Sequence, residues 1–261
     1  PPRSTLFPYT TLFRSEAKGL LAGLIAFVCV HEPPVQRNLP RVRELLRQPA
    51  DDFQDLLEMM AGSPNRFIAE TANAMSQKSD KERSGVISTA QSNLQFLNSA
   101  VICDTLASSD FSMLDLKSKR ITVYVILPTE HLNSQGRWLR LLVGEALAAM
   151  MSSERQKPDI PVLFLLDEFA ALGHLTIAKT AFTLGRGYGA KMCPILQNLD
   201  QLKGLYEKEY RTFLSNAGVT LFWSVNDLST AEEVSRMMGK YTQMTASRGM
   251  SESTQGGSVN Y

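Results

Sequence analysis

The feature that most constrains this chain is a short apolar run that ends in two carboxylates, at residues 161–169 with the sequence PVLFLLDEF. The unbroken apolar stretch from Val162 to Leu166 suits a strand that is buried on both faces of a parallel sheet. Asp167 and Glu168 follow it directly. Carboxylates at the end of a buried strand are costly unless they face a crevice that holds a cation, because desolvated charge must be paired.

This arrangement is typical of a Walker B motif. In such a motif the Asp, here Asp167, holds Mg²⁺ through water, and the Glu, here Glu168, polarises the water that attacks a γ-phosphate. The simpler alternative is that the acidic pair only caps the helix that follows the strand.

Three further runs, rich in β-branched or aromatic residues, predict strands at 121–127, 191–196 and 219–225. Apolar residues at helical spacing predict helices over 137–155, 174–184 and 199–214. Alternation of strand and helix is typical of repeated βαβ units in a doubly wound parallel sheet, where ligands bind beyond the carboxyl ends of the strands.

Polar residues follow each predicted strand, and turn or cap chemistry is the simpler interpretation for several of them. We expect Ser229 and Glu232 to form a capping box for a helix over 230–238 that Gly239 ends. Gln197 is different, because an amide that ends a buried strand beside the carboxylates could sense a γ-phosphate. The other residues of this kind are Thr129, Asn198, Asn226 and Asp227.

Residues 162–240 resemble the motor domain of TraG/TraD-type coupling proteins, on the stretches LLDEFAALG, LGRGYGAK, ILQNLDQL, FLSNAG and NDLSTAEEVSRMMGKYT. Residues 16–128 are similar to the same family, including LLAGLIAFV and ISTAQSNLQFL. The resemblance implies an α/β fold, with an incomplete RecA-like P-loop NTPase parallel sheet and an inserted all-α subdomain. It also implies ATPase motors that deliver DNA and protein substrates to type IV secretion and conjugation systems.

On this resemblance we expect the motor domain to comprise 16–33 and 84–246, with the all-α domain at 34–83. The leader at 1–15 resembles translated adaptor sequence and is expected to be non-native or disordered, and the tail at 247–261 disordered or truncated. The family's strand order implies that 121–127 pairs in parallel with 162–166, and 162–166 with 191–196. The slot between 191–196 and 219–225 belongs to the family's phosphate-loop strand and is expected to be vacant or badly closed.

The resemblance also implies the site residues and cofactors, which are ATP and Mg²⁺. Asp167 and Glu168 match the family's Walker B pair, Gln197 its polar sensor, and Arg186 the arginine that acts in trans on a neighbouring subunit's nucleotide. Arg186 has glycines at 185, 187 and 189, so a rigid guanidinium lies on a flexible turn that could cross an interface. The alternative is an ordinary exposed arginine after a helix.

For the whole protein the resemblance implies a homohexamer at the cytoplasmic face of the bacterial inner membrane. Its partners would be a single-stranded DNA/relaxase complex or protein effectors, and components of the type IV secretion channel. Two other interpretations are a non-hydrolysing substrate receptor or scaffold, and another RecA-like secretion or DNA-translocating ATPase.

Some patterns are absent from the sequence or weak in it. No G-x-x-x-x-G-K-[ST] occurs, so we expect this chain by itself not to hydrolyse ATP. No segment is long and apolar enough to span a membrane. Three single cysteines predict reduced core residues, and three scattered histidines predict no metal site.

Four arginines, at 37, 41, 43 and 47, could meet DNA or a relaxase, although a solvated helix face explains them more simply.

Overall fold

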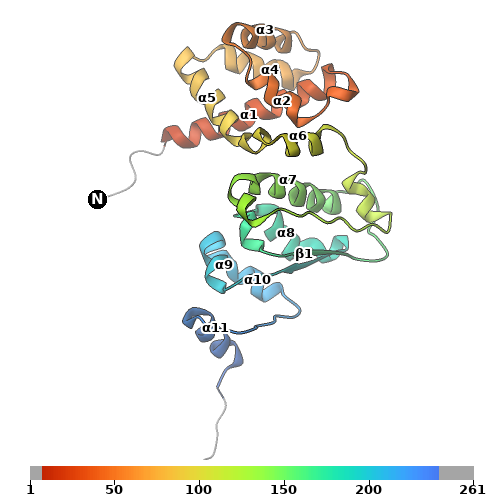
Figure 1. The fold of residues 1–261 in the computed structure, drawn as a ribbon, viewed down its shortest axis with the longest axis vertical. Coiled ribbons are helices and arrows are strands. Elements are labelled where there is room, and N and C mark those ends of the chain that lie inside the picture. The colour runs from red at the N-terminus through yellow and green to blue at the C-terminus, as the bar shows by residue number, and fades with distance from the viewer. Residues whose placement is uncertain (1–7, 241–261) are drawn as a thin grey trace, which may run out of the picture.

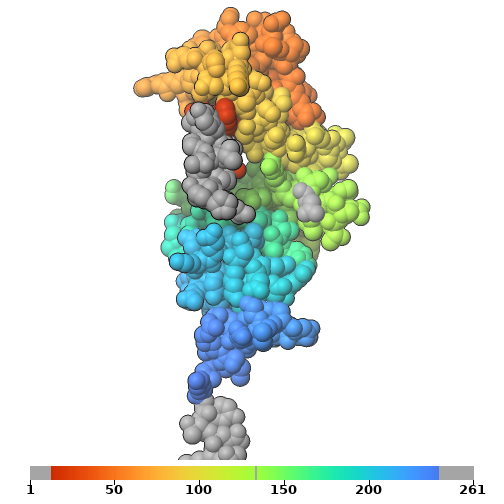
Figure 2. Space-filling model, turned by 90° about the vertical axis from the view of Figure 1, so that its left-hand side faces the viewer, coloured from red at the N-terminus to blue at the C-terminus, as the bar shows by residue number. Residues whose placement is uncertain are grey.

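A computed structural model describes residues 8–240 of the protein. The molecule is elongated (Figure 1), with a helical unit at one end, the long helix α7 next to it, then a small sheet, and α11 at the other end. Figure 2 shows the same order from another side. The predicted tail at 247–261 and the first seven residues of the predicted leader lie outside the described residues.

The first unit is all-α, and local capping signals explain several of its helix boundaries. The Asn65 side chain accepts hydrogen bonds at the start of α4, and Ser79 and Glu82 form a capping box at the start of α5. Its helices are α1 (Pro8–His31), α2 (Leu39–Leu46), α3 (Ala50–Ala61), α4 (Arg66–Ser76), α5 (Asp80–Asn93) and α6 (Ala100–Ala107), with 3-10 turns η1 (Pro34–Gln36) and η2 (Gln95–Asn98).

The all-α unit is larger than the predicted 34–83. Its core runs from Ala17 on α1 to Ile102 on α6, so residues 16–33 and 84–107 pack here and not with the sheet. Helix α1 begins at Pro8, so residues 8–15 of the leader that we expected to be non-native or disordered are helical, which contradicts the expected disorder. The boundary prediction fails because α1 buries its apolar face against α4 and α5, and a helix can only be assigned to a core through such contacts.

The second unit holds one parallel sheet in the described part of the chain. Strand β1 (Val162–Leu166) pairs with β2 (Ala190–Pro194), in register from Val162 opposite Ala190 to Leu166 opposite Pro194. The predicted parallel pairing of 162–166 with 191–196 is therefore confirmed. The helices around it are α7 (Leu132–Met151), α8 (Thr176–Leu184), α9 (Leu199–Tyr206), α10 (Tyr210–Asn216) and α11 (Leu228–Met238), with turns η3 (Met113–Lys117), η4 (Thr129–His131), η5 (Phe169–Leu172), η6 (Gly185–Tyr188) and η7 (Glu207–Glu209).

The strands predicted at 121–127 and 219–225 do not form, so the predicted pairing of 121–127 with 162–166 is wrong for this structure. Both segments lie outside any sheet, and Tyr124 and Trp223 are 82% and 91% exposed. β-branched and aromatic residues favour a strand because they pack well on a pleated, half-buried surface. No neighbouring strand provides such a surface here, so these two segments do not form strands. Because 219–225 forms no strand, the described residues do not define the slot that we expected between 191–196 and 219–225, and that expectation stays a prediction.

The sheet is covered on one face only. Phe164 is buried in a core cluster that includes residues of α7 and α8, whereas Leu163 and Leu165 on the opposite face are 61% and 62% exposed. Strand β1 therefore carries apolar residues on both faces, but the described residues cover one of them.

Two predictions about helices also need correction. The helix predicted over 199–214 is broken into α9 and α10 by Glu207, whose φ is 47°. Helix α11 begins after Asp227, whose side chain accepts a 2.8 Å hydrogen bond from the Thr230 backbone N–H, so Ser229 is not the cap. The Ser229 hydroxyl instead donates to Asp200 on α9 at 2.7 Å.

Helix α7 belongs to both cores. Trp138 and Leu141, near its start, pack against the core of the all-α unit. Leu147 and Met150, nearer its end, are fully buried in the core beneath the sheet. One helix therefore joins the two units of the molecule.

The cysteine prediction is confirmed in part. All three cysteines are free, but Cys29 and Cys193 are exposed and Cys103 is only half-buried, so they are not core residues. No helix among residues 8–240 has the length and hydropathy that a membrane crossing requires.

Candidate functional site

The carboxyl ends of β1 and β2 bring the predicted carboxylates and the predicted sensor together. The Gln197 side-chain Nε2 donates to both oxygens of the Glu168 carboxylate, at 3.0 Å and 3.3 Å. Asp167 is the next residue along the chain, and its Oδ1 accepts from the Glu168 backbone N–H at 3.2 Å. Three of the four predicted site residues thus form one cluster at an open edge of the sheet.

Glu168 has a strained backbone. Its φ of 50° and ψ of 49° lie in the left-handed region, which costs a residue other than glycine about 1–2 kcal/mol. Such conformations persist only where the surroundings over-determine them, and they gather at functional sites. The strain at Glu168 supports a functional role for this carboxylate.

The strained turn is held on both sides by the sheet and the core. The Ile195 N–H donates to the Leu166 carbonyl, and the Phe169 N–H donates to the Ile195 carbonyl, both at 3.0 Å. The Phe169 side chain is fully buried, and its ring lies 6.2 Å and 5.9 Å from those of Tyr206 and Phe213. Phe169 therefore anchors the turn that presents Glu168.

Gln197 is positioned by the first turn of α9. Its backbone N–H donates to the Gln201 side chain at 3.0 Å, and the Gln201 N–H donates to the side chain of the N-cap Asn198 at 3.0 Å. Sequence reasoning missed Gln201, although its spacing four residues after Gln197 is the signal that could have found it. Asn198 and Asp227, which we interpreted as cap residues, are both N-caps.

Arg186 lies at the other end of the sheet. It sits on η6, which precedes β2, whereas Asp167 and Glu168 follow β1. Since β1 and β2 are parallel and five residues long, Arg186 and Glu168 are separated by about 15 Å of strand. Arg186 is exposed and makes no ion pair with any residue in the described range, so it is free to meet a group outside this chain.

The donor set fits a magnesium ion that is shared with a nucleotide. Mg²⁺ is usually bound by one or two carboxylates together with waters and substrate phosphates, and Asp167 would supply a carboxylate for the metal, with the Glu168 carboxylate beside it. Residues 8–240 contain no group of three or more His, Cys, Asp or Glu side chains that could hold a metal without such help.

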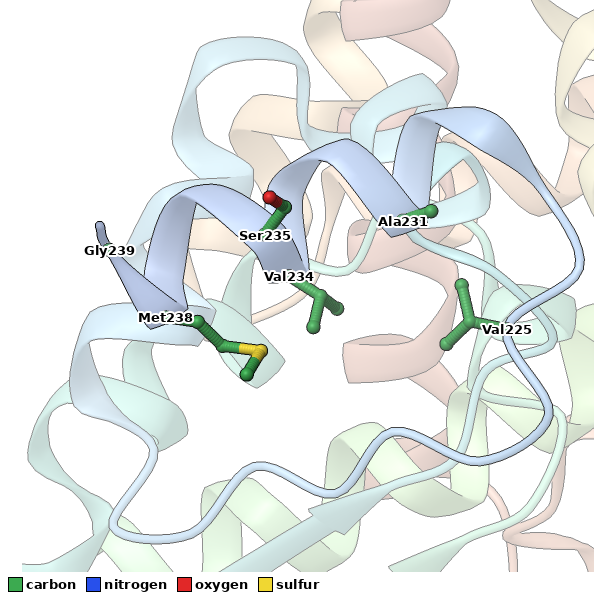
Figure 3. A pocket seen from close by; sticks show the side chains of 6 residues that line it. All are labelled: Val225, Ala231, Val234, Ser235, Met238 and Gly239. Carbon is green, nitrogen blue, oxygen red and sulfur yellow. The ribbon is translucent and has the colours of Figure 1, made fainter. Parts of the chain in front are cut away.

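The apolar hollow in Figure 3 is a different place. It has a volume of about 380 Å³ and is lined by Val225 and by one face of α11, including Val234 and Met238. None of the predicted site residues lines it. It reflects the incomplete packing of the segment that precedes α11.

Two parallel strands with carboxylates and an amide at their carboxyl ends, beside a helical unit, are consistent with an incomplete RecA-like α/β fold that carries an all-α subdomain. The family model for type IV secretory system conjugative DNA transfer matches residues 8–261, and the chain belongs to that family. This confirms the resemblance to coupling proteins stated from the sequence.

Two curated relatives show how the chain aligns with the family. It is 30% identical to the type IV secretion system-coupling protein VirD4 of Bartonella quintana (strain Toulouse), over 95% of this chain and 40% of the relative. It is also 30% identical to the conjugal transfer protein TraG of Agrobacterium fabrum, over 93% of this chain and 38% of the relative. The chain thus spans about 40% of the length of these relatives.

Solved structures of the plasmid coupling protein TrwB share the fold. The complex of TrwB with a non-hydrolysable GTP analogue aligns with a TM-score of 0.64 and 19% identity, over 86% of this chain and 52% of TrwB. The complex of TrwB with ADP and Mg²⁺ aligns with a TM-score of 0.59. Nucleotide and Mg²⁺ binding are thereby shown for TrwB.

Proposed function

We propose that this chain supplies the hydrolytic residues of an ATP-driven coupling protein. The observation that carries the proposal is the hydrogen bond from Gln197 to Glu168 at the carboxyl edge of the sheet. This contact supports the proposal because it joins a neutral amide to a strained carboxylate at the carboxyl ends of parallel strands, the region where folds of this type bind ligands.

Each residue has a distinct role in the proposed chemistry. Bound Mg²⁺–ATP supplies the electrophilic γ-phosphate and the charge that activates it. Asp167 holds the metal through water, and Glu168 accepts a proton from the attacking water. Gln197 keeps the Glu168 carboxylate in place and senses whether the γ-phosphate is present. Arg186 lies too far from Glu168 to act on a nucleotide bound to its own chain. It instead stabilises the transition state at the nucleotide of a neighbouring subunit.

For the whole protein we propose a homohexamer at the cytoplasmic face of the bacterial inner membrane. It would recruit a single-stranded DNA/relaxase complex or protein effectors and pass them to the type IV secretion channel. The strand carrying a G-x-x-x-x-G-K-[ST] loop would fill the slot beside β2, where the described residues place no strand.

The test compares two variants of the full-length protein. Glu168→Gln should bind ATP but not hydrolyse it, because the amide still accepts a hydrogen bond from Gln197 but cannot accept a proton. Arg186→Ala should assemble and bind ATP but hydrolyse it about 10³ to 10⁵ times more slowly. Arg66→Ala is the matched control, since Arg66 is 91% exposed on the all-α unit.

Mixing the two inactive variants tests action in trans. Some interfaces of a mixed ring pair an intact Glu168 with a neighbour's intact Arg186, so partial activity should return. Hydrolysis by Arg186→Ala at the parent rate would show that the trans-acting residue lies elsewhere. If both variants transferred substrate as well as the parent, the chain would belong to a scaffold and not to a motor.

A further inference from the structure

The four arginines that follow α1 separate into two pairs with different environments. Arg41 is bound to the carboxylate of Glu32 at 2.8 Å and to that of Glu44 at 3.3 Å. Arg37 donates its Nε to the backbone carbonyl of Glu32 at 2.9 Å. The first pair is therefore engaged with its own chain beside Glu32.

The second pair has no such compensation. Arg43 and Arg47, one turn apart at the end of α2, both donate to one oxygen, the Asn98 Oδ1, at 3.1 Å and 2.9 Å. Within the described residues, neither guanidinium lies within 4.0 Å of a carboxylate. Two positive charges thus converge on one neutral acceptor, although like charges at this spacing repel each other.

Arg43 also carries an unused donor. Its Nε is buried and has no hydrogen-bond partner, which is unusual because buried polar atoms are nearly always bonded. A buried donor without a partner costs about 1–3 kcal/mol. Protein covers this Nε, so an anion would meet the exposed Nη groups that Arg43 and Arg47 turn toward Asn98, where it would neutralise the repulsion between the two guanidiniums.

The surrounding backbone adds positive potential at the same place. Asn98 ends η2, and α6 begins two residues later at Ala100. The N-cap of α6, Ser99, makes no side-chain capping hydrogen bond. Free backbone N–H groups at a helix start carry partial positive charge and favour anions, phosphate among them.

We propose that Arg43, Arg47 and Asn98 form a phosphate-binding site on the all-α unit. A phosphate offers at least three acceptor oxygens and up to two negative charges, which suits two guanidiniums from successive turns. A carboxylate offers two oxygens and one charge, and one guanidinium already satisfies it. The site lies in the other unit from Glu168 and does not depend on the proposed hydrolytic function.

The phosphate can come from two sources, which are a free phosphate or nucleotide and the backbone of a nucleic acid strand. The test titrates the 261-residue protein with inorganic phosphate, followed by ³¹P NMR, and with a labelled oligothymidylate, followed by fluorescence anisotropy. The double variant R43Q/R47Q should lose at least tenfold in phosphate affinity. The control R37Q/R66Q removes the same charge from two arginines outside the site and should bind as the parent does.

The salt dependence distinguishes the two sources. If the strand backbone is the ligand, the oligonucleotide should bind more tightly than free phosphate. The slope of log K against log salt should then be shallower in R43Q/R47Q, by about 0.7 for each strand phosphate that the variant no longer neutralises. If free phosphate is the ligand, phosphate should bind the parent without displacing the oligonucleotide, and the variant should not alter that slope.

Two results would overturn the proposal. One is equal phosphate affinity in R43Q/R47Q and in R37Q/R66Q, with both folded by circular dichroism. The other is binding of acetate as tightly as phosphate. The variant R43K/R47K guards against a folding defect, because it keeps both charges but lacks the planar fork, so its affinity should lie between those of the parent and R43Q/R47Q.

Discussion

Replacing Phe169 with alanine should both destabilise the second unit and release the turn that presents Glu168. The ring is fully buried and lies within 6.3 Å of the rings of Phe182, Tyr206 and Phe213. Truncating a buried phenylalanine to alanine costs about 3–5 kcal/mol, and the loss of aromatic neighbours places this site in the upper half of that range.

Urea unfolding followed by circular dichroism measures the effect. With a typical slope of about 2 kcal/mol/M, the loss moves the midpoint by roughly 2 M. Phe67→Ala on α4 is the matched control, because Phe67 is 49% exposed and its truncation should shift the midpoint little. Phe169→Leu should retain most of the stability and allow measurement if the alanine variant does not fold. Equal midpoints for Phe169→Ala and Phe67→Ala would refute the view that Phe169 anchors the turn.

Two further predictions concern stability. Glu168→Gly should raise the free energy of unfolding by up to about 1 kcal/mol, because glycine adopts the φ of 50° without strain. The control Glu58→Gly should lower the free energy of unfolding by a similar amount, because it puts a glycine inside α3. A loss of stability in Glu168→Gly would contradict the strain. The salt bridge from Lys119, helped by the Ser112 N–H and by Arg155, holds the pKa of the Asp115 carboxyl below its ordinary 3.8. Asp115→Asn should therefore be less stable than the parent at pH 7, and the difference should shrink as the pH falls below 3.8 and through the lowered pKa of Asp115, where the folded parent also takes up the proton. A deficit in Asp115→Asn that stays constant over this pH range would refute the linkage.

Local chemistry made part of the site predictable. The apolar run from Val162 to Leu166 and the polar residues after each strand could be identified from the sequence, because strand length and the clustering of strand ends are local consequences of a parallel sheet. The left-handed turn at Glu168 could not, since glutamate has no preference for that conformation and only the anchors on either side impose it.

The remaining errors come from contacts between distant residues. The apolar pattern of α1 predicts a buried face but does not identify the core against which that face packs. The structure packs α1 into the all-α unit, so that unit is larger than predicted. The segment at 121–127 has the composition of a strand, but pairing also needs a neighbouring edge. Asn98 carries no signal of its own, because the convergence of Arg43 and Arg47 on it joins residues about 50 positions apart.

Helix α7 holds the two units together by side-chain packing, in addition to the covalent linker that joins them. The chain passes from the all-α unit to the second unit through residues 108–112, all of which are exposed. Trp138 and Leu141 return to the first core by side-chain packing, and the Arg137 guanidinium donates to the Ser92 carbonyl. A protease that cut the exposed linker would therefore leave two fragments that remain associated and migrate together until a denaturant separates them.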